Sequence, residues 1–148
     1  MTFRERRTVA SFISTLLIFG IFYFFLLRRY HGESMQLAEE LRFWAVATLI
    51  FIGIMVILKI ISYIIFTILH AIATREYEEI DTDELEKLIE LKATRNAYMV
   101  FLAGFILSLV TLIIGMPVMV MFSSLIGAFT LAAMSADISQ LYYYRKGI

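Results

Sequence analysis

Two ionisable residues, Lys59 and Asp137, stand within or at the end of long hydrophobic runs of this 148-residue chain. A charge at the centre of a bilayer costs roughly 2.5–3.5 kcal/mol on insertion scales, so such a group usually has a partner or a function. Helical periodicity places hydroxyl-bearing residues on the same faces, Ser62 with Lys59 and Thr130 with Asp137. Both faces are therefore candidates for the interior of a helix bundle.

The depths of the two charges predict that they meet. At 1.5 Å per residue, Lys59 lies roughly 22 Å from Trp44 and Asp137 roughly 28 Å from Val118, the residues at which their runs begin. We expect an intramembrane charge pair in the inner half of the bilayer, with three nearby hydrogen-bond partners, Ser11, Ser14 and Ser62. The alternatives are that Lys59 extends to the headgroups and that Asp137 is exposed at the membrane boundary.

Recognisable catalytic chemistry is missing from the sequence. It contains no nucleophile elbow, phosphate-binding loop, dinucleotide fingerprint or HExxH motif. It has no cysteine, and its two histidines, His31 and His70, fall on opposite sides of the predicted membrane. We therefore predict a non-enzymatic protein without a metal or cofactor. The balance of 13 basic and 13 acidic residues argues against nucleic acid as a partner.

Four apolar runs predict the elements that position these residues. The chain is 61% hydrophobic, against about 45–50% in an average soluble domain. The predicted fold is all-α, a single transmembrane domain over residues 1–148 that forms an integral four-helix bundle. Its spans cover about 8–27, 43–69, 98–114 and 118–136. Trp44 is expected to anchor the second span at the membrane interface.

The last two spans are predicted to form a tight antiparallel hairpin. Gly115 ends one helix and Pro117 opens the next. Small residues recur every fourth position along the final span, a pattern that allows helices to approach closely. This predicted helix-packing stripe consists of Ser124, Ala128, Ala132 and Ala136.

The polar stretch between the second and third spans, about residues 70–97, is predicted to form a cytoplasmic helical extension. Asp81 is the expected cap, and no glycine or proline interrupts residues 82–103. An apolar face of this helix, formed by Leu85, Leu88 and Ile89, is expected to pack on the end of the second span. The charged residues form either a solvated face or a docking surface, for which the candidates are Asp83, Glu84, Glu86, Glu90 and Arg95.

The same stretch carries a resemblance. Asp83-Glu84, then Leu88-Ile89-Glu90-Leu91-Lys92-Ala93-Thr94-Arg95 and Ala97-Tyr98, resembles the D-E-xxx-L-I-E-L-K-A-x-R-x-x-Y motif of a family of small, uncharacterised prokaryotic four-span membrane proteins. The resemblance covers the C-terminal half of the chain. It implies the four-span architecture and no particular chemistry.

The distribution of basic residues predicts the orientation. Four spans put the N-terminus, the central segment and the C-terminus on one side, where nine of the lysines and arginines lie, against Arg28, Arg29 and Arg42 on the other. This asymmetry favours a multi-pass protein of the inner (cytoplasmic) membrane with both termini in the cytoplasm.

Two functions of different classes follow from these features. The leading hypothesis is a scaffold or accessory subunit in contact with membrane lipid that associates with itself, as a homo-oligomer, or with another membrane protein. The alternative is a small transporter or ion/proton-coupled membrane protein that uses Lys59 and Asp137. A lipid-acting enzyme is a third and weaker idea.

Overall fold

Four long α-helices make up the part of the chain that the structure describes. The computed structural model describes residues 3–30, 36–74 and 84–147. The helices are α1 (Phe3–Arg29), α2 (Leu37–Thr74), α3 (Glu84–Ile113) and α4 (Val118–Lys146). Each is long and apolar enough to cross a membrane, and a helix satisfies its own backbone polar groups, as lipid requires. The predicted all-α membrane fold is confirmed. Asp81, the expected cap of the third helix, lies outside the described residues.

The helices are longer than the hydrocarbon of a bilayer requires. With 38 residues in α2 and 30 in α3, their lengths are roughly 57 and 45 Å, against about 30 Å of hydrocarbon. Their charged ends therefore project beyond it. The predicted extension between the second and third spans corresponds to the first part of α3, and α2 continues to Thr74.

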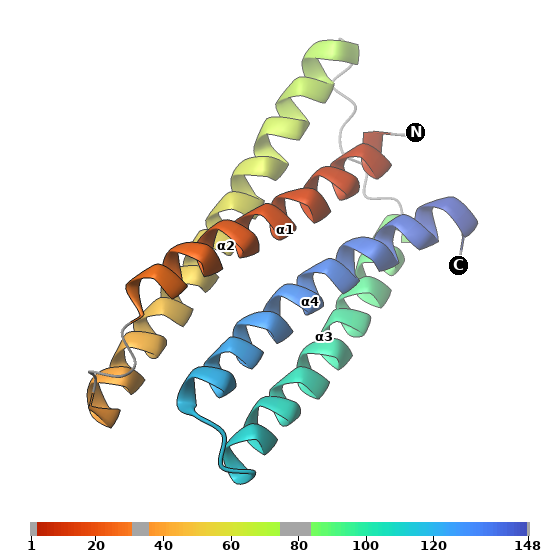
Figure 1. Ribbon diagram of the computed structural model, residues 1–148. Coiled ribbons are helices and arrows are strands. Elements are labelled where there is room, and N and C mark those ends of the chain that lie inside the picture. Colours follow the sequence, from red (N-terminus) through yellow and green to blue (C-terminus); the bar gives the residue numbers. More distant parts are fainter. Residues whose placement is uncertain (1–2, 31–35, 75–83, 148) are drawn as a thin grey trace.

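Helix α4 is the centre of the arrangement. It packs against α1, α2 and α3, and α1 also packs against α2. Figure 1 shows α3 and α4 side by side, with α1 beside the other flank of α4 and the C-terminal half of α2 diverging from the group. Within the described residues, α2 and α3 do not pack against each other.

This arrangement corrects one expectation. Of the apolar face at the start of α3, Ile89 is buried, but Leu85 and Leu88 are exposed and do not pack on the end of α2. The inner side of α2 faces α1 instead, where Phe66 lies 6.3 Å from Phe3 between ring centroids. The tight connection between α3 and α4 holds α3 against α4. The end of α2 therefore packs against α1 rather than against α3.

The turn after α3 explains that tight connection. Gly115 adopts φ 91°, a left-handed conformation that glycine accepts without strain. The Met116 amide donates to the Thr111 carbonyl at 3.0 Å and the Gly115 amide to the Leu112 carbonyl at 3.1 Å. These two bonds form a Schellman motif. Pro117 directly precedes α4, which therefore runs back along α3.

An aromatic core fills the end of the bundle away from the two termini. Trp44 and Phe51 are fully buried, and Phe122 of α4 stacks on Trp44 with 6.3 Å between ring centroids. Phe22 of α1 lies 5.1 Å from Phe51. The expectation that Trp44 anchors the second span at the membrane interface is wrong, because the indole faces α4 rather than lipid.

Candidate functional site

Lys59 and Asp137 meet between α2 and α4. The Lys59 Nζ atom lies 3.4 Å from Asp137 Oδ2. The Ser11 hydroxyl of α1 lies 3.1 and 3.2 Å from the two carboxylate oxygens, to which it donates. Lys59 Nζ also donates to Ser11 Oγ at 3.1 Å. The two expected residues, with Ser11, thus join three helices in one polar cluster.

The surrounding residues give the two charges unequal environments. Asp137 is 6% exposed, whereas the Lys59 side chain is 37% exposed. Ser11 is held in the cluster by α1, where its carbonyl also accepts the Thr15 hydroxyl at 2.9 Å. Ser14, an expected partner, donates instead to the Ala10 carbonyl of its own helix. Ser62, the third expected partner, is half-buried and is not hydrogen-bonded to the pair.

The cluster lies a short distance inside the charged end of the bundle. Arg7 of α1 covers the ring of Tyr63 at 5.1 Å, and Tyr63 follows Lys59 by four residues, or about 6 Å of helix. On α4, Arg145 follows Asp137 by eight residues, or about 12 Å. The pair therefore lies in the half of the bilayer next to this charged end rather than at its centre, which lowers its cost.

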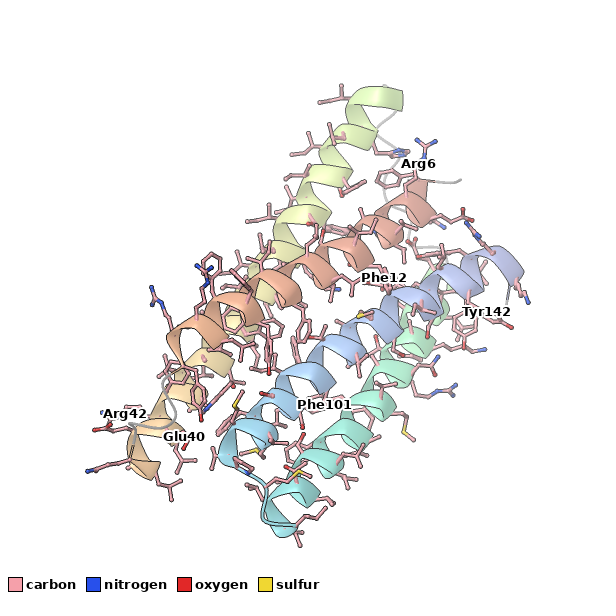
Figure 2. The ribbon with its side chains drawn as sticks, viewed as in Figure 1. Arg6, Phe12, Glu40, Arg42, Phe101 and Tyr142 are labelled. Carbon is pink, nitrogen blue, oxygen red and sulfur yellow. The ribbon has the colours of Figure 1, made fainter. Side chains whose placement is uncertain are left out.

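A small cavity between α1 and α4 reaches Asp137 but not Lys59. Its volume is about 120 Å³, and its walls are apolar apart from Thr8 and Asp137. Phe12, one of its lining residues, lies at the junction of α1 and α4 in Figure 2. A carboxylate, a hydroxyl and an ammonium in contact provide exchangeable protons, and Asp137 is one of the residues that line the cavity.

The candidate docking helix divides into two faces. Glu84, Glu90 and Arg95 are exposed, as a docking surface requires. The assignment of Glu86 to that surface is wrong, because its side chain is 4% exposed and pairs with Arg4 of α1 at 3.1 Å. Asp83 lies outside the described residues.

Three polar contacts turn the other face of this helix toward the bundle. Besides the Arg4–Glu86 pair, Asn96 donates to the Ser139 hydroxyl at 3.0 Å. The Lys92 ammonium stands 5.7 Å from the centre of the Tyr143 ring. Helical periodicity does not predict this attachment, because it identifies an apolar face but not which charged residues turn toward α1 and α4.

Two leucines lie on the outer face among the exposed charges. Leu88 is 42% and Leu91 69% exposed, and helical geometry places both between Glu84 and Arg95. Six charged residues between positions 84 and 95 keep this segment out of the hydrocarbon. The side chains of Leu88 and Leu91 are therefore exposed outside the hydrocarbon core of the bilayer.

The predicted helix-packing stripe faces inward over its middle part. Ala128 and Ala132 are buried, and Ser124 and Ala136 are half-buried. Ala128 meets Gly104 of α3. Small side chains at this contact let the two backbones approach closely.

Comparison with known proteins identifies no relative of this chain. No protein-family model, curated protein or solved structure matches the chain.

Proposed function

We propose that the protein is a non-enzymatic membrane scaffold or accessory subunit that presents the outer face of the first part of α3 to a protein partner. The observation that carries the proposal is the exposure of Leu88 and Leu91 on a segment too charged to enter the hydrocarbon. Apolar side chains surrounded by charged residues on a water-exposed surface are typical of interaction sites.

The attachment of this segment supports the proposal. Glu86, Ile89 and Ala93 are buried on the inner face, so the helix is fixed to α1 and α4 before any partner binds. A preformed helical face loses little conformational entropy on binding. Exposed Glu84 and Arg95 add charges of both signs, which would orient a partner.

Site-specific photocrosslinking in native membranes tests the proposal. A photoreactive residue at Leu91 should give one discrete protein adduct, because a specific partner covers this face. An adduct at twice the chain mass of 17.1 kDa identifies a second copy, and any other discrete mass identifies a different protein.

The matched control is the same photoreactive residue at Leu107, which is exposed on the same helix within the apolar part of the span. It should label lipid or a diffuse set of proteins. Introducing Leu88→Ser into the protein labelled at Leu91 should weaken the discrete adduct. Identical labelling from both positions would show that the outer face of the charged segment is not a docking surface.

The Lys59–Asp137–Ser11 cluster favours a second candidate, a proton- or ion-coupled transporter. Its support is the small cavity between α1 and α4 that Asp137 lines. Purified protein in vesicles containing a pH-sensitive dye should then show proton flux that Asp137→Asn abolishes and Glu5→Gln preserves, because Glu5 pairs with Arg145 near the bundle end. Flux no greater than in empty vesicles under an imposed gradient would contradict this candidate.

A further inference from the structure

A second and larger cavity lies at the opposite end of the bundle from the Lys59–Asp137 pair. It is a cleft between the C-terminal half of α1 and the N-terminal half of α2, with a volume of about 600 Å³. Cavities of about 300–1,000 Å³ are typical of small-molecule sites. Figure 2 marks this end of the molecule by Glu40 and Arg42, far from Arg6 at the end near the termini.

The chemistry of the lining changes along the cleft. Leu26 and Ala47 line it from buried positions, and Phe22 and Ile50 line it farther along the helices from the charged end. Helix geometry puts these last two about 10 and 12 Å from the charged end, counting from Arg29 and Arg42 respectively. The cleft is therefore apolar in depth and charged only at the end of the helices.

Three charged side chains line that end. Arg29 of α1 and Arg42 and Glu39 of α2 all belong to the lining, and together they carry a net charge of +1. Arginine is suited to phosphate, because its planar guanidinium donates paired hydrogen bonds. One phosphodiester with its single negative charge complements this set.

We propose that the cleft binds one anionic phospholipid, with an acyl chain along the apolar walls and the phosphate between Arg29 and Arg42. The pattern matches a lipid because the charges coincide with the helix ends, where headgroups lie, and the apolar lining continues into the depth of the spans. Phe25 and Val46 are exposed lining residues, so the cleft opens sideways and a lipid can enter from the bilayer. The inference is independent of the docking function proposed above.

The test uses the full chain, purified and reconstituted in phosphatidylcholine vesicles. Each preparation contains a trace of phosphatidylglycerol or of phosphatidylcholine with a photoreactive acyl chain. Labelling by the anionic probe should concentrate on residues 22–26 and 43–50 and exceed labelling by the zwitterionic probe. Arg29→Gln and Arg42→Gln should each lower the ratio of anionic to zwitterionic labelling about fivefold, since a basic residue at a membrane surface contributes about that factor.

A blocking variant separates a site from ordinary lipid contact. Val46→Trp places a large ring at the cleft from an exposed position, so the fold should persist, and labelling of residues 22–26 should fall. Ala103→Trp, at an exposed position of α3, should leave that labelling unchanged. Equal labelling by the two probes in the unmodified protein, or equal labelling of the cleft and of the exposed face around Leu107, would overturn the proposal.

Discussion

Gly104 of α3 and Ala128 of α4 lie so close that a Cβ atom on Gly104 would stand 2.4 Å from the Cβ atom of Ala128. Real Cβ atoms essentially never approach another atom within 3.0 Å. In lipid, helices are held together by close packing and polar contacts rather than by the exclusion of water. In the described residues α3 packs its backbone against α4, and the Arg4–Glu86 ion pair joins it to α1, so this contact is central to its attachment.

Gly104→Ala should therefore lower the free energy of unfolding by about 1–3 kcal/mol, the usual cost of overpacking. Reversible unfolding in detergent measures this difference. Gly53→Ala is the matched control, because Gly53 is also helical and no atom lies within 4 Å of its added Cβ; its stability should be unchanged or slightly higher. Equal stability of the two variants would show that α3 and α4 shift apart enough to accommodate the added methyl group without a loss of stability.

Arg4→Gln should loosen the start of α3. The change leaves the buried Glu86 carboxylate without its ion pair, and an unsatisfied buried group costs about 1–3 kcal/mol. Amide exchange over residues 84–93 should become faster, and adding Glu86→Gln should slow it again. Arg6→Gln, at an exposed neighbouring position, serves as the control. Unchanged exchange in Arg4→Gln would mean that the ion pair does not hold this segment.

The overall architecture could be predicted because it depends on local chain properties. Span length and apolarity set the four helices, and the turn chemistry of Gly115 and Pro117 set the hairpin. The approach of Lys59 to Asp137 followed from counting helical rise from each end of the bilayer, which places charges in depth.

The lateral order of the helices could not be predicted in the same way. Periodicity shows that a helix has an inner face, but it does not identify the neighbour that covers that face. Trp44 was expected at the membrane interface and faces α4, and Glu86 was expected on a solvated or docking face and pairs with α1. Both errors arise because the sequence does not show whether a neighbouring helix is present. A tryptophan can lie at the membrane interface or pack against a helix, and a charged residue can be exposed to water or buried in an ion pair.

Both ends of the described chain lie on one side of the bundle, as an even number of spans requires. Glu5 and Arg145 approach to 3.9 Å there, and N and C lie at the same end in Figure 1. The nine-to-three distribution of basic residues predicts that this side is cytoplasmic. Reporter fusions after Ile148 and within residues 32–35 should report the cytoplasm and the opposite side respectively. A C-terminal fusion active only outside the cytoplasm would reverse the orientation.

Asp137→Asn should destabilise the protein, because it leaves the Lys59 ammonium without the carboxylate at 3.4 Å. Lys59→Met combined with Asp137→Asn should recover part of that loss, since neither residue then carries an unpaired charge. A double-mutant cycle in the reversible unfolding assay should give a coupling energy of about 0.5–3 kcal/mol, as for residues in contact. The same cycle on Glu5 and Arg145, whose side chains lie 3.9 Å apart with Arg145 half exposed, should give less than about 1 kcal/mol. Additive effects at Lys59 and Asp137 would mean that the lysine is solvated independently from the headgroup region and that the two residues do not act as a unit.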